Sequence, residues 1–218
     1  MKVLYEDDDI IVVHKAPGIA VQSGSVGSMD LVSEIKNYLK APYIGVVHRL
    51  DQPVEGVMVF GKTKTASAAL SKQVRDHIFN KRYDAIVVMT REGIETTGRL
   101  EDYILSDRKT NRSTIVEDGI SGAKKAILDY RLRDMQENDD IKTVRAEIDL
   151  YTGRHHQIRL QMSHAGMPVL GDRKYSTGNS GGGTGLCLAA TSLGFKHPVT
   201  GKDLNYQITP EFLAKRRV

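Results

Sequence analysis

The alternation of hydrophobic and polar residues predicts that short β-strands make up most of the regular structure. It is clearest at residues 144–150, where Val, Ala, Ile and Leu alternate with Arg, Glu and Asp. This period of two is typical of a strand with one buried face. Mainly apolar runs at 56–60 and 84–89 predict two further, more deeply buried strands. Residues 3–5 and 10–13 predict a hairpin that turns over the acidic residues between them.

Hydrophobic residues at helical spacing predict three helices. The first begins after Ser28, a candidate N-cap, and extends towards Pro42. The second covers residues 66–78, with Lys and Arg on its opposite side. The third is short, starts near Ile158 and ends at Gly166, since glycine commonly terminates a helix.

These elements place the chain in the α+β class. Strands outnumber helices and do not alternate with them as in a parallel sheet, so we expect a mixed, mainly antiparallel sheet flanked by helices. No internal repeat and no linker rich in Pro or Ser divides the sequence, which predicts one catalytic domain over residues 1–218. The Gly-rich segment 178–185 is predicted to be a surface loop, because the Lys and the helix of a phosphate-binding loop do not follow it.

The composition is that of an ordinary globular protein, with 40% hydrophobic and 27% charged residues among 218. The single cysteine, Cys187, excludes an internal disulfide and fits a reducing cytosol. Because acidic residues at positions 6–9 interrupt the segment where a secretory signal needs a long apolar run, and no such run occurs elsewhere, we expect a cytoplasmic protein without a secretory signal or membrane span. The net charge of +4 favours a polyanionic partner, since Lys and Arg neutralise phosphates.

Two polar clusters lie next to predicted strands. The first, at residues 48–51, reads His-Arg-Leu-Asp and enters a turn bounded by Pro53 and Gly56, a place where folds commonly hold reacting groups. Taken alone, it is better explained as a turn in which Asp51 pairs with the neighbouring Arg. The second, at residues 80–83, reads Asn-Lys-Arg-Tyr. It is either a basic helix end followed by a β-forming Tyr, or an aromatic face for a base beside cations for phosphates.

A third polar cluster follows the strand at 144–150. It packs two Arg, two His and a Gln into residues 154–159, a density of long donors that is unusual for a segment that packs a core. A metal site built from His155, His156 and His164 is conceivable, but neither the spacing nor the nearby carboxylates resemble a zinc motif. We therefore expect no bound metal.

In this order the clusters resemble the motifs of the RluA family of pseudouridine synthases. Residues 48–51 with Gly56 are similar to the catalytic signature, Lys81-x-Tyr83 to the second motif, and residues 152–159 to the third. The resemblance spans nearly the whole chain, because three further segments also fit: Lys15-x-Pro17-Gly18, Gly166-x-Pro168-x-Leu170-Gly171-Asp172-x-x-Tyr175 and His197-Pro198-x-Thr200-Gly201.

The resemblance implies the pseudouridine synthase fold and an enzyme that isomerises uridines in structured ribosomal or transfer RNA. It makes Asp51 the essential carboxylate, Arg159 its basic partner, and Tyr83 the aromatic residue that stacks on the uracil. Arg49 would fill the space that the flipped base leaves. The RNA contacts that we expect are His48, Arg49, Lys81, Arg154, His156 and Gln157. No metal, nucleotide or redox cofactor is implied, nor an obligate protein partner, and a monomer is the default.

One feature departs from the family pattern. Glu55 stands where the family usually has Ser or Thr before Gly56, which bears on the turn geometry and on substrate preference. Some relatives carry an additional N-terminal RNA-binding domain, and we expect none here.

Two other functions compete with this interpretation. A catalytically silent RNA-binding protein of the same fold is disfavoured, because the charge of Asp51 would weaken phosphate binding. A nucleoside or glycoside hydrolase needs a second carboxylate opposite Asp51, for which Glu55 is the nearest candidate. A zinc-dependent base deaminase is excluded, since one cysteine cannot supply its ligands. The sequence does not decide which uridine reacts, nor whether Asp51 attacks C1′ or C6 or abstracts the C2′ proton.

Overall fold

The computed structural model describes residues 1–23, 29–107, 109–138, 141–176 and 185–214. The chain forms two compact units. The first unit consists of Met1–Lys81 and Ala189–Val218, and the second unit of Arg82–Leu188. The single domain expected over residues 1–218 stays a prediction.

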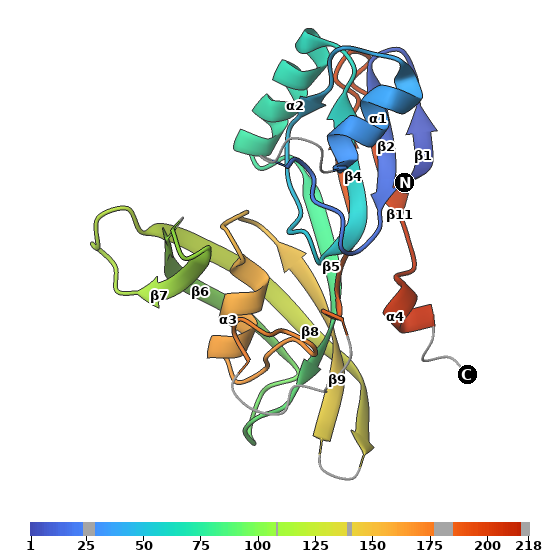
Figure 1. The fold of residues 1–218 in the computed structure, drawn as a ribbon. Helices are drawn as coiled ribbons and strands as arrows, with labels where there is room; N and C mark the ends of the chain where they lie inside the picture. The colour runs from blue at the N-terminus through green and yellow to red at the C-terminus, as the bar shows by residue number, and fades with distance from the viewer. Residues whose placement is uncertain (24–28, 108, 139–140, 177–184, 215–218) are drawn as a thin grey trace. The chain divides into compact units, whose positions relative to one another are not determined.

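The first unit is built on a mixed sheet. Its strands are β1 (Lys2–Glu6), β2 (Ile10–Lys15), β3 (Gly45–Val46), β4 (Glu55–Gly61), β10 (Leu188–Lys196) and β11 (Asp203–Gln207). They follow the order β1-β2-β4-β10-β11, with β3 also paired to β4 (Figure 1). Strands β4 and β10 run parallel, whereas the remaining pairs of this unit are antiparallel. The predicted hairpin at 3–13 is confirmed as β1 and β2, and the buried strand at 56–60 as β4.

In the described part of the first unit, the helices are α1 (Leu31–Leu39), α2 (Lys64–Arg75) and α4 (Glu211–Ala214). The Asp30 carboxylate caps α1 by accepting the backbone N–H of Ser33. The predicted cap, Ser28, lies outside the described residues. Helix α2 begins at Lys64, after the N-cap Thr63, and ends at Arg75, before the expected position 78.

Strands β2 and β4 are buried on both faces, which explains their nearly continuous apolar sequences. Ile10 and Val12 belong to a core that includes Leu70 of α2. Ile11 and Val13 point to the opposite face and are equally inaccessible to solvent. The strand that leads away from the loop of Asp51 is therefore among the most rigidly packed parts of this unit.

The second unit is built on an antiparallel sheet, and among its described residues the helix is α3 (Gln157–His164). Its strand order is β5-β9-β8-β6-β7. The strands are β5 (Asn80–Val88), β6 (Thr97–Asp107), β7 (Arg112–Val116), β8 (Lys124–Asn138) and β9 (Ile141–Leu150). Strands β5 and β9 and helix α3 confirm the elements predicted at 84–89, 144–150 and 158–166.

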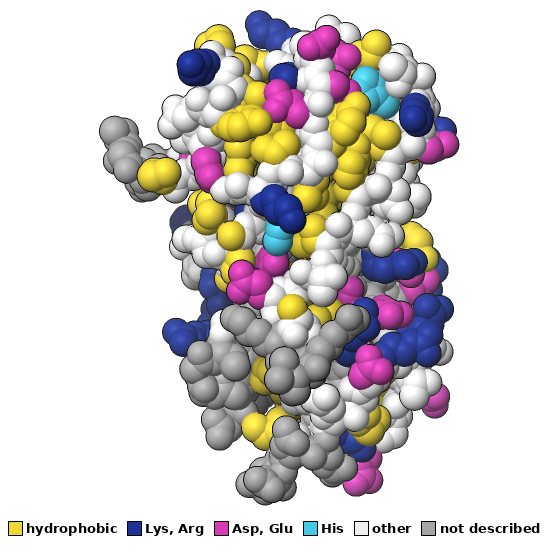
Figure 2. Space-filling view, turned by 90° about the vertical axis from the view of Figure 1, so that its right-hand side faces the viewer, with side chains coloured by type: hydrophobic (Ala, Val, Ile, Leu, Met, Phe, Trp, Pro, Cys, Tyr) yellow, Lys and Arg dark blue, Asp and Glu magenta, His cyan; other side chains and the backbone are white. Residues whose placement is uncertain are grey.

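The two faces of this sheet differ in polarity. On the buried face, Tyr83 of β5 lies opposite Ile148 of β9. On the other face, ion pairs join Arg82 to Asp149 at 3.0 Å and Arg145 to Asp84 at 2.7 Å. Figure 2 shows the same close mixture of basic and acidic side chains on one face of the protein. Charges that neutralise their neighbours create no extended positive field.

The expected fold class, a mixed and mainly antiparallel sheet with helices, is confirmed. Among the described residues, no helix combines the length and the apolar character that crossing a membrane requires. Of the loop predicted at 178–185, all but Gly185 lies outside the described residues.

Candidate active site

Asp51 lies in a tight turn that leads into β4. The Val54 N–H donates to the Asp51 carbonyl oxygen at 3.0 Å, which closes the turn. Leu50 and Val54 on either side are buried and anchor the turn in the core. The Asp51 side chain itself is half-buried, and Arg49 is exposed. The turn therefore presents the Asp51 carboxylate from a fixed backbone.

Lys15, at the end of β2, fixes this turn by a hydrogen bond to its backbone. Its side chain is fully buried, and its ammonium donates to the carbonyl oxygens of Ala16, Ile19 and Gln52 at 3.1, 2.8 and 3.0 Å. The Gln52 carbonyl oxygen also accepts the Gly18 N–H at 2.9 Å. All three ammonium protons are thus used to join the segment after β2 to the residue that follows Asp51.

The charge of Lys15 acts on Asp51 as well. Burial lowers the pKa of Lys15 to about 8, and attraction by the Asp51 and Glu55 carboxylates partly offsets this effect. At neutral pH the ammonium is therefore charged and favours the ionised form of Asp51. Sequence reasoning placed Lys15 in a motif without giving it a role. The available signal was a lysine at the end of the apolar run 10–13.

His48 links the same loop to β4. Its Nε2 accepts the backbone N–H of Val59 at 3.1 Å, and its ring lies edge-on to Phe79. Burial and the nearby Lys81 ammonium lower the pKa of His48 to about 3, so the ring is neutral with its proton on Nδ1. The RNA contact expected of His48 stays a prediction, and it would have to use Nδ1.

Glu55, the residue that departs from the family pattern, is buried, and both of its carboxylate oxygens accept hydrogen bonds. Its Oε1 accepts a hydrogen bond from His14 Nε2 at 2.8 Å, and its Oε2 accepts the Glu211 N–H at 3.2 Å. The longer side chain thus connects the start of β4 to β2 and to α4. A carboxylate held in this way is poorly suited to act as the second catalytic group of a hydrolase.

Gly56 is required by the approach of two strands. A Cβ at this position would lie 2.5 Å from the Ala190 Cβ and 2.8 Å from the Ala190 backbone N and O. Gly56 and Ala190 are register partners in the parallel pair of β4 and β10. The glycine that closes the first motif therefore lets β10 pack directly against the start of β4.

In the second unit, Gln157 organises the start of α3. Its Oε1 accepts the Thr152 hydroxyl at 2.8 Å and the Arg154 N–H at 3.0 Å. Its Nε2 donates to the Ile127 carbonyl oxygen at 3.2 Å and to Gln161 Oε1 at 2.9 Å. The side chain is 3% exposed, so both ends of its amide are used inside the unit. In the structure Gln157 fixes the backbone before α3, and the RNA contact expected of it stays a prediction.

Arg159 forms a buried, two-pronged ion pair with Asp172. Its Nε donates to Oδ2 and its Nη2 to Oδ1, both at 2.7 Å. The guanidinium also lies over the ring of Tyr175, 5.4 Å from the ring centre. Within its own unit, the carboxylate partner of Arg159 is therefore Asp172. The predicted pair of Arg159 with Asp51 joins residues of different units and stays a prediction.

His156 is held beside Arg159 in an unusual backbone conformation. Its φ of 54° is left-handed, and its Nδ1 shares a hydrogen bond of 2.8 Å with the Tyr175 hydroxyl. Burial and the positive charges of Arg159, His155 and Lys174 lower the pKa of His156 to about 3. The ring is therefore neutral at physiological pH and takes no part in proton transfer there.

The remaining predicted residues differ in accessibility. Tyr83 is buried on the inner face of β5, and Lys81, in the first unit, is half-buried. Arg154 is also half-buried, and its Nε donates to the Lys125 carbonyl oxygen at 2.8 Å. The second unit thus brings Arg159, His156 and Arg154 together on and before α3, while the first unit brings Lys15 to Asp51.

One cluster has the composition of a metal site. Carboxylate and imidazole atoms of Asp7, Asp9 and His197 lie within 4.8 Å of one another. However, His197 Nε2 donates to Asp7 Oδ2 at 2.8 Å, and its Nδ1 accepts the Thr200 N–H at 3.1 Å. Both ring nitrogens are therefore used in hydrogen bonds. The cluster ties the turn of the first hairpin to the turn between β10 and β11.

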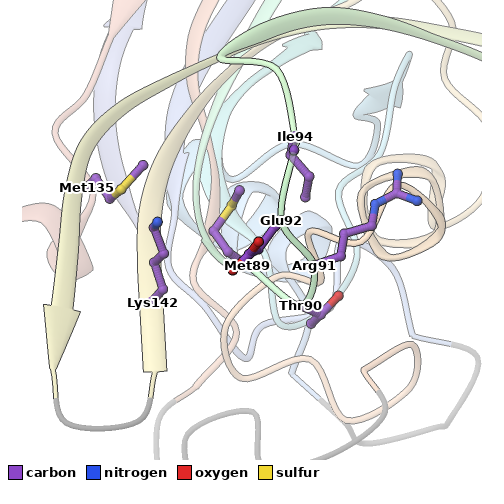
Figure 3. Close-up of a pocket in the computed structure, with 8 residues that line it drawn as sticks. Met89, Thr90, Arg91, Glu92, Ile94, Met135 and Lys142 are labelled. Atoms are coloured by element: carbon purple, nitrogen blue, oxygen red, sulfur yellow. The ribbon is translucent and has the colours of Figure 1, made fainter.

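A hollow of about 540 Å³ lies elsewhere in the second unit (Figure 3). It is formed by residues 89–94, which follow β5, and by Met135 and Lys142 of the β8–β9 hairpin. Its lining includes none of the predicted catalytic or RNA-contacting residues. It is lined by Met and Ile side chains and a few charged groups, a combination that indicates no particular ligand or reaction.

The sequence and structure of this chain are similar to those of known pseudouridine synthases. A family model described as RNA pseudouridylate synthase matches residues 9–164, a segment that contains Asp51, Tyr83 and Arg159. The chain belongs to this family. The structure of a human protein titled RNA pseudouridylate synthase domain containing 4 is similar to this chain, with a TM-score of 0.77 at 22% identity. The match covers 98% of this chain and 90% of the human chain. The human protein titled domain containing 1 matches with a TM-score of 0.79 at 20% identity, covering 98% and 85%. Both likenesses concern the fold.

Family members of closer sequence are bacterial. Ribosomal large subunit pseudouridine synthase D of Vibrio parahaemolyticus is 31% identical over 94% of this chain and 66% of its own length. The protein of the same name from Haemophilus influenzae is 32% identical over 80% and 52%. An uncharacterized RNA pseudouridine synthase, YlyB of Bacillus subtilis, is 30% identical over 99% and 71%. The chain thus spans 66% of the length of the Vibrio protein and 52% of that of the Haemophilus protein.

Proposed function

We propose that the protein isomerises uridine to pseudouridine in structured RNA, with Asp51 as the essential carboxylate. The observation that carries this proposal is the Asp51 turn, which Lys15 holds by hydrogen bonds and by charge within the segment that the family model matches. A half-buried carboxylate that stays ionised is the group that such a reaction needs.

The chemistry is a rearrangement without a co-reactant. The C1′–N1 bond breaks, the uracil turns, and a C1′–C5 bond forms, while the C5 hydrogen leaves as a proton and N1 gains one. Asp51 can serve as a nucleophile at C1′ or C6, or as the base that removes the C2′ proton. Each route requires the ionised carboxylate, which the Lys15 ammonium favours.

The other site residues would bind and orient the substrate. Tyr83 would stack on the uracil, and Arg159 would hold the Asp51 oxygens in position. Arg49, which is exposed beside Asp51, would occupy the space of the flipped base. The further RNA contacts would be made by Lys81, Arg154, His48, His156 and Gln157.

Ribosomal RNA is the substrate that we propose, because relatives covering much of this chain are named ribosomal large subunit pseudouridine synthases. Transfer RNA is the second candidate. We further propose that the protein works in the cytoplasm as a monomer without a cofactor. Its one cysteine, Cys187, is buried and is consistent with a reducing compartment.

Release of tritium from transcripts labelled at uracil C5 tests the proposal. We expect release from large-subunit ribosomal RNA with the native protein and none with Asp51→Asn. Asp8→Asn, which changes an exposed carboxylate of the first hairpin turn, is the matched control and should be as active as the native protein. Equal release by Asp51→Asn would overturn the role of Asp51. Binding without release would indicate a silent RNA-binding protein, and free uracil as product would indicate a hydrolase.

A further inference from the structure

We propose that Asp172 and Tyr175 are positioning residues, which hold the Arg159 guanidinium in one plane and one direction for the reaction. The inference rests on the proposed function, in which Arg159 orients the catalytic carboxylate. Both residues lie beyond the segment 9–164 that the family model matches, and neither is among the site residues predicted from sequence.

The first argument is the geometry of the pair. Asp172 accepts from Nε and Nη2 of Arg159, at 2.7 Å each, so the carboxylate and the guanidinium are joined along one edge. Two parallel hydrogen bonds fix both the plane and the direction of the guanidinium, whereas one bond would leave it free to rotate. The guanidinium has five N–H donors, and two of them are used in the pair with Asp172. Its other edge, formed by Nη1 and Nη2, has the geometry that binds a carboxylate or a phosphate.

The second argument is that Asp172 is itself held in place. Its Oδ1 also accepts the backbone N–H groups of Lys174 and Tyr175, at 2.8 and 3.2 Å. Its own N–H donates to the Val169 carbonyl oxygen at 3.0 Å. Burial would raise the pKa of Asp172, but Arg159 and these N–H groups lower it below its ordinary value. The carboxylate is therefore a charged and immobile support at neutral pH.

The third argument is the placement of the Tyr175 ring. The Arg159 guanidinium lies over it, 5.4 Å from its centre. The Tyr175 hydroxyl accepts the Ser113 N–H at 2.8 Å, and it shares a hydrogen bond of 2.8 Å with Nδ1 of His156. These contacts hold the ring from both β7 and the start of α3. Arg159 is thus supported along one edge by Asp172 and across one face by Tyr175.

Stability alone does not account for this arrangement. The exposed fractions are 5% for Arg159 and 1% for Asp172, so both charges are withdrawn from water. A buried ion pair generally stabilises a fold no more than apolar side chains of similar volume. What it adds is a defined orientation, and orientation is what a group that acts on a reacting carboxylate requires.

Chemical rescue tests the role of Asp172. In Arg159→Ala, added guanidinium ion should bind beside Asp172 and restore part of the tritium release. In the double variant Arg159→Ala/Asp172→Asn, which leaves no unpaired buried charge, the same ion should restore none. Equal rescue of both variants would overturn the proposal.

Kinetics of the single variants test the same point. Asp172→Asn and Tyr175→Leu should lower kcat by about 10- to 100-fold and leave the Kd for RNA nearly unchanged. Asp149→Asn, which breaks the exposed pair with Arg82, is the control and should leave kcat unchanged. A rise in Kd with unchanged kcat would contradict a positioning role.

A measurement without substrate separates this inference from the proposed function. In the native protein, the Nε–H of Arg159 should exchange slowly with water by ¹⁵N NMR, and that of the exposed Arg82 should exchange fast. Asp172→Asn should abolish the protection of Arg159. If the native Arg159 Nε–H exchanges as fast as that of Arg82, the positioning role is wrong, whether or not the protein isomerises uridine. If protection is observed but no RNA is modified, the proposed function fails while the support of Arg159 stands.

Discussion

The Lys15 ammonium donates a hydrogen bond of 3.0 Å to the carbonyl oxygen of Gln52, the residue that follows Asp51. One buried side chain thereby sets the backbone of the turn and supplies a positive charge that attracts its carboxylate. The shape of the turn and the ionisation of Asp51 consequently depend on the same residue.

Lys15→Met should impair both stability and activity. It leaves the carbonyl oxygens of Ala16, Ile19 and Gln52 without the ammonium that they bind, and each such loss costs about 1–3 kcal/mol, partly offset by removing a buried charge. We expect the free energy of unfolding in urea to fall by about 2–3 kcal/mol. Tritium release should be largely lost. Lys64→Met, at the exposed start of α2, is the control. An unaltered unfolding curve for Lys15→Met would contradict the structural role.

The pH dependence of activity and stability should diverge because of Lys15. Its pKa of about 8 in the folded protein lies below the ordinary value of 10.5, so the unfolded chain binds more protons between these values. Stability from this group therefore rises with pH from about 8 to 10.5, whereas activity falls as the ammonium is lost. Both trends are measured relative to Lys15→Met, in which they should be absent. Parallel trends in the two proteins would show that another group is responsible.

Gly56→Ala should destabilise the first unit. The new methyl group would overlap Ala190 across the β4–β10 pair, and overpacking of this kind costs about 1–3 kcal/mol. Gly185→Ala is the matched control, because a Cβ at Gly185 meets no atom within 4 Å. Thermal unfolding of the two variants decides the question. Equal midpoints would mean that the strands separate without cost.

Asp7→Asn should reduce stability at neutral pH by about 1–2 kcal/mol. Burial would raise the pKa of Asp7, but the N–H groups of Ile10 and Asp9 and the side chains of Tyr5 and His197 lower it to about 2. A lowered carboxyl pKa stabilises the fold above the ordinary value of 3.8, and this contribution is lost as the pH falls towards 2. Urea unfolding at pH 7 and pH 3 should therefore show a smaller difference between the native protein and Asp7→Asn at the lower pH. Asp8→Asn should match the native protein at both.

Gln157→Leu should destabilise the second unit by about 2–3 kcal/mol, because it leaves the Thr152 hydroxyl and the Arg154 N–H without their acceptor. Gln22→Ala, at an exposed position, is the control for loss of a glutamine. Hydrogen exchange of the Arg154 amide reports the effect locally. Unchanged protection of this amide would show that Gln157 does not hold it.

The sequence predicts the fold class and most elements that border the site, since their periodicity is strong. Strands β2, β4, β5 and β9 were expected at their positions, although their pairing was not. The long strand β8 was not predicted, although Ala126, Leu128, Tyr130 and Leu132 alternate with polar residues there. Arg131 and Arg133 belong to cross-strand ion pairs with Glu147, and such pairs exist only after pairing. When the polar side chains of a strand are paired with charges on a neighbouring strand, the local sequence alone predicts that strand only weakly.

The candidate site was predicted as a set of residues, but not as a set of contacts. Motif order identified Asp51, Tyr83 and Arg159. The order of the motifs could not reveal that the Gln157 amide forms hydrogen bonds within its own unit, or that Asp172 forms an ion pair with Arg159. Such roles depend on segments 13 residues apart or on different strands, and spacing carries no information about which donor meets which acceptor.

The first unit is assembled from two separated stretches of sequence, and this has a consequence for biosynthesis. On one side β4 pairs with β2, with Lys15 opposite Gly56. On the other side Glu55 and Gly56 pair with Ala189 and Ala190 of β10. A ribosome-bound chain that ends before these residues would carry Asp51 and its motif, but the start of β4 would lack one of its flanking strands. The second unit is continuous in sequence and can fold while it is being synthesised. The turn that carries Asp51 would then reach its final surroundings only after residues 189 and 190 have left the ribosome, later than the continuous second unit that precedes them.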